Sequence, residues 1–282
     1  MNFHQKPNTF VSHVKIKVQD LDRSIQFYQQ IVGFDIFEKT ENTVQLTADG
    51  KTSILSLERP EGVQPKESRT TGLYHFAILL PTRKDLADFV FHVVNEGVQL
   101  GASDHLVSEA LYFSDPDGNG IEVYADRDPA NWKWQSDQVI MAVDPLDFEN
   151  LAKEGNPNAW QGLPPKTVMG HIHLHVAELT KTQEFYTKGL GFDIVASLGN
   201  QALFIATGNY HHHIGLNTWN GVGAPQPPVN SAGLEYFELT YPNQNSLDQV
   251  IEKLNSIGVS VMEDADKAMI TDPSGNKIKL TV

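Results

Sequence analysis

Two histidines and one glutamate carry the main chemical signal in this sequence. His13, His75 and Glu122 each fall at an inward-facing position of a predicted strand. Two imidazoles and one carboxylate are the smallest set that holds a divalent iron through three protein bonds while other coordination positions stay open for substrate and oxygen. An inward direction is easy to arrange at each position, because alternate side chains of a strand share one face. The sequence therefore predicts one open metal site formed by these three residues.

Composition limits the classes of protein to which the chain can belong. Of its 282 residues, 40% are hydrophobic and 20% are charged, which is typical of an ordinary globular protein with one or two cores. The formal net charge of −14 argues against nucleic acid or an anionic membrane as a partner, since both favour a basic surface. Because there are no cysteines, any metal must be held by histidine and carboxylate. The absence of a signal-like or membrane-spanning run predicts a cytoplasmic protein.

The chain contains an internal repeat. The segments His13–Val18 and His171–Val176 match each other, and each precedes a helix-like stretch. The first expected helix starts at Asp20 and the second at the box Thr180-x-x-Gln183, and glycines (Gly33 and Gly191) end them. The repeat predicts that the two halves of the chain share one fold.

Each half repeats again more weakly. Residues 72–125 and residues 233–282 both show a strand, a helix and further strands, with the helices expected over Lys84–Glu96 and Ser246–Ile257. Before the last strand of each half comes a similar turn, Asp115–Asn119 in one and Asp272–Asn276 in the other. We therefore expect an α+β protein that consists of four βαβββ modules.

The modules predict two domains and a connector. We expect residues 1–126 to form an N-terminal domain with the metal site, and residues 168–282 to form a C-terminal domain. The connector, residues 127–167, has five prolines and three tryptophans, so it is expected to pack against both domains. In the second half, Tyr236 replaces His75 and Lys279 replaces Glu122. A protonated lysine cannot hold a cation, so the C-terminal domain should have lost the site.

Paired βαβββ modules with an Asp-Pro-Asp-Gly-Asn turn before the last strand resemble the vicinal oxygen chelate superfamily. The resemblance covers essentially the whole chain outside the connector. It implies that the modules pair into two half-open barrel domains, with metal ligands on the first strand of each module and on the last strand of the second.

The stretch from His105 to Glu122 resembles the signature of extradiol ring-cleaving dioxygenases. The shared features are a histidine, an apolar-Tyr pair, a D-P-x-G turn and the ligand glutamate. The resemblance implies that Tyr112 hydrogen-bonds a bound catecholate, and that His105 holds a substrate oxygen or assists proton transfer. It further implies an Fe(II)-dependent enzyme that opens catechol or a substituted catechol with O2 to a muconic semialdehyde-type product, with Mn(II) as the other candidate metal. Its partners would be a small aromatic diol and O2, and a homo-oligomer is compatible with the sequence.

Two features depart from that family pattern. Two-domain enzymes of this type usually keep iron in the C-terminal domain, whereas the three predicted ligands here are N-terminal. The family also has a second catalytic histidine on the strand before the second module, and residues 51–74 contain none. The histidines His211–His213 sit at the related place in the other half.

Three alternatives stay open from the sequence. The first is a different metal site, formed by His171, His173 and His175 with His211–His213. The second is another metalloenzyme of the superfamily, a glyoxalase or an epimerase. A glyoxalase adds a fourth carboxylate ligand, and Ser56 stands at that position with Glu58 on the same strand face. The third is a protein that binds an aromatic ligand without catalysis, which the intact set of three ligands argues against.

Overall fold

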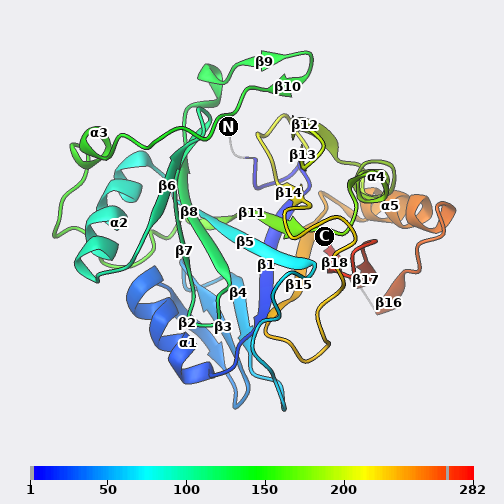
Figure 1. The fold of residues 1–282 in the computed structure, drawn as a ribbon, viewed down its shortest axis with the longest axis horizontal. Coiled ribbons are helices and arrows are strands. Elements are labelled where there is room, and N and C mark those ends of the chain that lie inside the picture. The colour runs from blue at the N-terminus through cyan, green and yellow to red at the C-terminus, as the bar shows by residue number, and fades with distance from the viewer. Residues whose placement is uncertain (1–2, 265–266) are drawn as a thin grey trace.

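Two eight-stranded sheets form the body of the molecule (Figure 1). The computed structural model describes residues 3–264 and 267–282. The first sheet has the strand order β16 (Met262–Asp264), β17 (Lys267–Thr271), β18 (Lys277–Thr281), β15 (Gly233–Thr240), β1 (Phe10–Lys17), β4 (Ser53–Glu58), β3 (Thr43–Thr47) and β2 (Asp35–Lys39). The second sheet has the order β12 (Asp193–Leu198), β13 (Ala202–Ala206), β14 (Ile214–Asn217), β11 (Val168–His175), β5 (Gly72–Leu79), β8 (Gly120–Asp126), β7 (Ser108–Ser114) and β6 (Gly101–Asp104). The α+β class and the four strand-rich modules are confirmed.

The modules pair across the two halves of the chain. Strand β1 of the first module runs antiparallel to β15 of the fourth, and β5 of the second module runs antiparallel to β11 of the third. Each sheet therefore contains strands from both halves. The expected pairing of neighbouring modules, with one barrel in residues 1–126 and another in residues 168–282, is not what the sheets show. The repeat reveals that the modules are alike, but it carries no signal for which first strands pair.

Each module contributes one helical segment. They are α1 (Leu21–Phe27) with the π-helical turn η1 (Tyr28–Val32), α2 (Arg83–Asn95), α4 (Leu179–Glu184) with η3 (Phe185–Gly189), and α5 (Gln244–Ser256). The Asp20 side chain caps α1 as expected, because it accepts a hydrogen bond from the Arg23 amide. Gly33 ends η1 with a φ of 93°, a left-handed conformation that glycine adopts without strain. The start of α4 was predicted wrongly, since Glu178, and not Thr180, caps this helix.

The connector packs against the rest of the molecule, as its tryptophans indicate. It contains η2 (Pro129–Asn131), the ribbon of β9 (Trp134–Gln135) and β10 (Gln138–Val139), and the short helix α3 (Phe148–Ala152). Trp132 is buried and stacks on Phe3, with the ring centres 5.5 Å apart. Trp160 stacks on His92 of α2 with the ring centres 5.6 Å apart.

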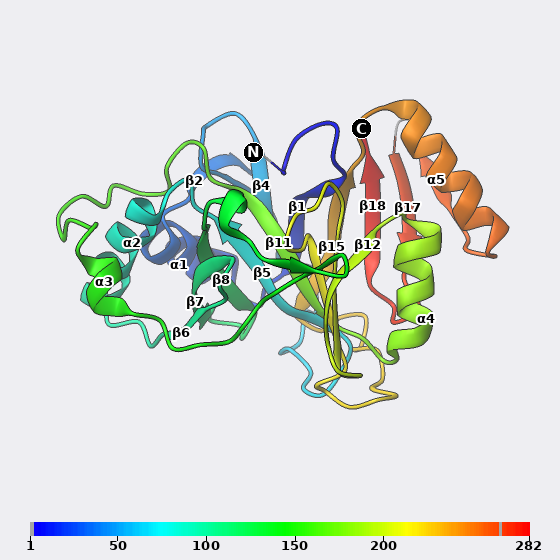
Figure 2. The ribbon, with the colours of Figure 1, turned by 90° about the horizontal axis from the view of Figure 1, so that it is seen from above.

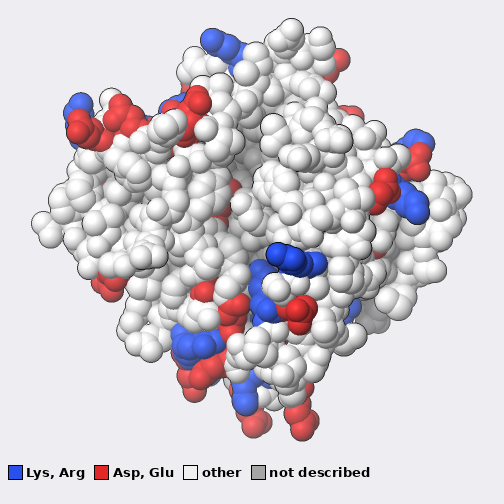
Figure 3. Space-filling model, in the orientation of Figure 1, with Lys and Arg blue, Asp and Glu red and all other residues white. Residues whose placement is uncertain are grey.

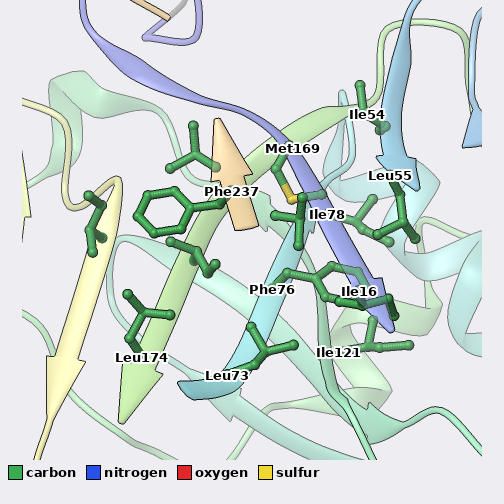
Figure 4. Packing of buried hydrophobic residues seen from close by; sticks show 14 of the residues in the cluster. Ile16, Ile54, Leu55, Leu73, Phe76, Ile78, Ile121, Met169, Leu174 and Phe237 are labelled. Atoms are coloured by element: carbon green, nitrogen blue, oxygen red, sulfur yellow. The ribbon is translucent and has the colours of Figure 1, made fainter. Parts of the chain in front are cut away.

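The main core lies between the two sheets. Figure 2 shows the central strands of the sheets side by side, and Figure 4 shows Ile16 of β1, Phe76 of β5 and Phe237 of β15 within one packed cluster. All three are fully buried. Because side chains alternate along a strand, the neighbours of these core residues point to the opposite face of each sheet. These two outer faces, one per sheet, carry the chemically active side chains.

Charged side chains gather at the rim and in the lower middle of the face that Figure 3 shows, with basic and acidic residues side by side, and most of the rest of that face is uncharged. Within the part of the chain that the structure describes, none of the helices combines the length and the apolar character that crossing a membrane requires.

Candidate metal centre

Three potential metal ligands meet on the outer face of the second sheet: His75 of β5, Glu122 of β8 and His171 of β11. Nε2 of His75 lies 3.0 Å from Oε2 of Glu122, and Nε2 of His171 lies 3.1 Å from the same oxygen. The two Nε2 atoms are 3.4 Å apart. All three residues are buried, so their ligand atoms converge on one point away from solvent.

The protonation states of this group suit a divalent metal. Burial raises the pKa of Glu122, but attraction and hydrogen bonds from His171 and His75 outweigh it and hold that pKa well below its usual range. Burial lowers the pKa of His171 to about 4, against the opposing effect of Glu122. At neutral pH the group therefore offers a carboxylate and a neutral imidazole, the states in which these side chains bind metal.

Sheet register explains how the ligands come together. His171 lies opposite Ala77, Ala77 opposite Glu122, and Glu122 opposite Tyr112, in one row across four neighbouring strands. His75 is two residues before Ala77 and therefore shares its face. The small side chain of Ala77 leaves room between His171 and Glu122, so their ligand atoms can meet in front of it.

The structure does not bring His13 to this group. His13 lies on β1 in the first sheet, where its Nε2 is 2.8 Å from the hydroxyl oxygen of Ser56. The sequence-based expectation that His13 joins His75 and Glu122 rested on pairing the first module with the second. The third module lies beside the second instead, so His171, the counterpart of His13 in the repeat, stands in the expected place.

The pair from the dioxygenase-like stretch lies beside the centre. Nε2 of His105 is 2.6 Å from the hydroxyl oxygen of Tyr112, and Nδ1 of His105 is 2.7 Å from the carbonyl oxygen of Ala142 in the connector. The Tyr112 ring is 5.7 Å from that of His75. Burial, and to a lesser degree Glu122, raises the pKa of Tyr112 well above its usual value, so its phenol stays protonated.

A further histidine at the centre was not assigned a role from the sequence. His212 packs against His171 with the ring centres 4.1 Å apart. Its Nδ1 is 2.8 Å from Nδ1 of His211, whose Nε2 in turn lies 2.8 Å from Oδ1 of Asp126. The run His211–His213 was the available signal, but nothing local in it indicates which member faces the centre.

The separate metal site considered from the sequence does not form. Among residues 3–264 and 267–282, the histidines of β11 and the run His211–His213 make no further group of three ligands, and His171 belongs to the group with His75 and Glu122. His173 is buried beside that group, with its ring centre 5.0 Å from that of His75.

A cavity of about 630 Å³ leads to the centre. His75 and Tyr112 line it together with Tyr74, His175 and Lys66. Its volume is in the range of small-molecule sites, so a ligand with one aromatic ring fits there.

Buried neutral histidines make the folded state sensitive to acid. Burial lowers the pKa values of His4, His13 and His171 from 6.5 to about 4. Between pH 6.5 and pH 4 the unfolded chain binds more protons than the folded chain. The contribution of these residues to the free energy of unfolding is therefore complete above about pH 6.5, and it falls toward pH 4 by roughly 1.4 kcal/mol per pH unit for each residue. Urea unfolding of the metal-free protein at several pH values measures this loss. In His13→Gln the free energy of unfolding should fall less steeply with pH, by the contribution of about one proton. A free energy of unfolding that is constant from pH 7 to pH 5 would contradict the lowered pKa values of these histidines.

Comparison with known proteins gives one family and several relatives. Residues 11–123 and 168–280 match the sequence profile of the Glyoxalase/Bleomycin resistance protein/Dioxygenase superfamily. The chain is 44% identical over 269 residues to a catechol-2,3-dioxygenase of Bacillus subtilis (strain 168), with 94% of each chain covered. It is 28% identical over 161 residues to biphenyl-2,3-diol 1,2-dioxygenase 3 of Rhodococcus globerulus, which covers 53% of this chain and 85% of that one.

Solved structures share the fold at low sequence identity. A putative dioxygenase from Bacillus subtilis subsp. subtilis str. 168 has a TM-score of 0.68 at 13% identity, with 98% of this chain and 85% of that one covered. Glyoxalase I from Zea mays has a TM-score of 0.59 at 17% identity, with 96% and 92% covered. These likenesses show the arrangement of the four modules.

Proposed function

Because the chain belongs to the Glyoxalase/Bleomycin resistance protein/Dioxygenase superfamily, we propose that it is an Fe(II)-dependent extradiol dioxygenase that opens catechol or a substituted catechol with O2. The observation that carries the proposal is the three-ligand group beside the His105–Tyr112 pair, in a chain 44% identical to a catechol-2,3-dioxygenase. The product would be a ring-opened semialdehyde of the muconic type.

His75, Glu122 and His171 would hold the metal. Two histidines and one carboxylate are the ligand set of many ferrous oxygenases, because they leave several positions open. Iron held by these residues would supply a Lewis acid that lowers the pKa of the catechol hydroxyls.

The fourth ligand position of a glyoxalase is empty here. In the third module, Gly215 lies opposite His173 just as Ser56 lies opposite Lys15 in the first module. A Cβ atom at Gly215 would come within 2.7 Å of the His173 ring, so this position has no space for a carboxylate side chain. Glu58 forms an ion pair with Lys15 in the first sheet and is not part of the centre. This favours an open dioxygenase site over a glyoxalase site.

Two side chains of this chain, Tyr112 and His212, would contact the substrate, and His105 and His211 would orient them. The Tyr112 hydroxyl would contact a substrate oxygen. Because Nδ1 of His105 donates to the carbonyl oxygen of Ala142, its Nε2 is left to accept the Tyr112 proton, and the Tyr112 oxygen would accept a hydrogen bond from a catechol hydroxyl. His212 would supply the second histidine that residues 51–74 lack. Burial lowers the pKa of His212 well below its usual value, so the ring is neutral and its Nε2 can accept a hydrogen bond from a catechol hydroxyl. The Nδ1 contact with His211 sets the orientation of that ring.

Anaerobic loading with ferrous iron, followed by catechol and air, tests the proposal. We expect a yellow semialdehyde and one O2 consumed per catechol, because cleavage beside the diol inserts both oxygen atoms into the product. The same preparation loaded with Mn(II) tests the other candidate metal. If iron is bound and a panel of catechols gives no oxygen uptake, the proposal is wrong. Thiol-dependent isomerisation of a hemithioacetal without oxygen uptake would point to a glyoxalase, and a protein that stays metal-free would point to a binding protein.

A further inference from the structure

A second cavity lies on the outer face of the first sheet. Its volume is about 530 Å³, which is in the range of small-molecule sites. Its titratable lining residues are His13, Lys15, Tyr236, Glu238 and Lys279. The remaining lining side chains are serines, threonines and one glutamine, so polar groups cover nearly the whole wall.

This cavity occupies the place in the first sheet that the metal centre occupies in the second. His13 lies opposite Glu238, and Glu238 lies opposite Lys279, in the row that corresponds to His171, Ala77 and Glu122. A carboxylate therefore stands where the metal centre has the small Ala77, and an ammonium stands where the centre has its carboxylate. Lys279 and Glu238 form an ion pair. Where the second sheet has a group of metal ligands, the first sheet therefore has fixed charges of both signs.

His13 offers an unused hydrogen-bonding atom in this cavity. The residue is 8% exposed, and its Nε2 is engaged with Ser56. Its Nδ1 has no hydrogen-bond partner in the part of the chain that the structure describes. The nearest carboxylate oxygen, Oε1 of Glu238, is 3.9 Å away, which is too far for a hydrogen bond. A buried polar atom without a partner is costly, so this nitrogen is suited to a ligand.

The two ammonium groups of the cavity offer hydrogen-bond donors to a small anion. The ammonium groups of Lys15 and Lys279 lie 5.8 Å and 5.4 Å from the ring centre of Tyr236. Each ammonium has three donors, and one donor of each is used by a glutamate, Glu58 for Lys15 and Glu238 for Lys279. Glu58 and Glu238 balance the charges of the two ammonium groups, so a small anion would be held by the N–H donors that these ion pairs leave over, and not by an excess of positive charge.

We propose that this cavity binds a small hydroxylated monocarboxylate. The carboxylate lies beside the ammonium groups of Lys15 and Lys279, where charge-assisted hydrogen bonds hold it. The hydroxyl groups of the ligand bond to Nδ1 of His13 and to the hydroxyl and amide side chains of the wall. This site is separate from the metal centre and does not depend on the reaction proposed there.

Titration of the iron-loaded protein with 3-hydroxybutyrate, followed by NMR, tests this site. We expect saturable binding of one molecule per chain. Lys279→Met and Lys15→Met should each weaken it about tenfold, since a hydrogen bond to a charged group is lost. His13→Ala should weaken it severalfold. 1,3-Butanediol, which has a hydroxymethyl group in place of the carboxylate, and butyrate, which lacks the hydroxyl, should both bind more weakly.

The matched control is His171→Ala, the same change at the equivalent position of the other sheet. Although this variant loses the iron, it should leave binding of 3-hydroxybutyrate unchanged, because the cavity lies in the other sheet. Absence of saturable binding overturns the proposal. So does binding that persists in both folded lysine variants, or binding that His171→Ala removes, because the probe would then occupy another site. Thermal unfolding curves of each variant identify those that fold, and Lys15→Met keeps the test valid if Lys279→Met does not.

Discussion

Replacing His171 with alanine is expected to remove the metal and to abolish ring cleavage, whereas His13→Ala should keep the metal. The two histidines occupy equivalent positions of the repeat, but only His171 has its Nε2 near Glu122, at 3.1 Å. Loss of a residue that merely supports a metal ligand typically costs about 10–100-fold in metal affinity, so loss of one of three direct ligands should cost more than about 100-fold.

Metal content after anaerobic reconstitution and desalting measures this difference. The unchanged protein and His13→Ala should both retain one iron per chain, and His171→Ala should retain almost none. Oxygen uptake with catechol should fall with the iron in His171→Ala, to below about one hundredth of the original rate. An iron-free His13→Ala protein beside an iron-loaded His171→Ala protein would place the centre in the first sheet and contradict the assignment.

Local patterns were sufficient to predict the modules and part of the site. Alternation along β5 and β8 predicted that His75 and Glu122 share a face, and they do. The spacing of His105 and Tyr112 predicted that both lie near Glu122. In the structure the two residues contact each other, and Tyr112 lies opposite Glu122 on the neighbouring strand β8. These features depend on segments that are close in sequence, where strand periodicity and turns determine the geometry.

The third ligand could not be chosen from local patterns. His13 and His171 stand in strands with the same alternation, and either strand could lie beside β5. The choice is made by pairing between β5 and β11, which are distant in sequence, and by the core that β1, β5, β11 and β15 share. The two sheets then differ at one position of this row. Ala77 leaves space for a metal in the second sheet, whereas Glu238 fills that space in the first sheet and pairs with Lys279. A repeat identifies equivalent positions, but only tertiary pairing assigns them to a site.

The role of His212 was equally hidden, since it lies in a loop before β14 and between two other histidines. Its ring contacts His171, and a chain of contacts through His211 to Asp126 fixes its orientation. We expect His212→Phe to lower kcat by about 10²–10⁴-fold, the usual contribution of a positioned acid or base, while iron content stays at one per chain. Phenylalanine keeps a ring in this position and removes both nitrogens, so the loss reports on proton transfer and hydrogen bonding.

Steady-state oxygen uptake with catechol, normalised to bound iron, measures the effect of His212→Phe. His213→Gln is the matched control, because the neighbouring His213 directs its Nε2 to the carbonyl oxygen of Phe3 and takes no part in the centre. This control should keep kcat within about threefold, since its ring has no role in the proton transfer that position 212 is asked to supply. If His212→Phe binds iron fully and turns over within tenfold of the original rate, the proton is carried elsewhere. His105 would then be the histidine with the required reach, because its Nε2 already contacts the Tyr112 hydroxyl.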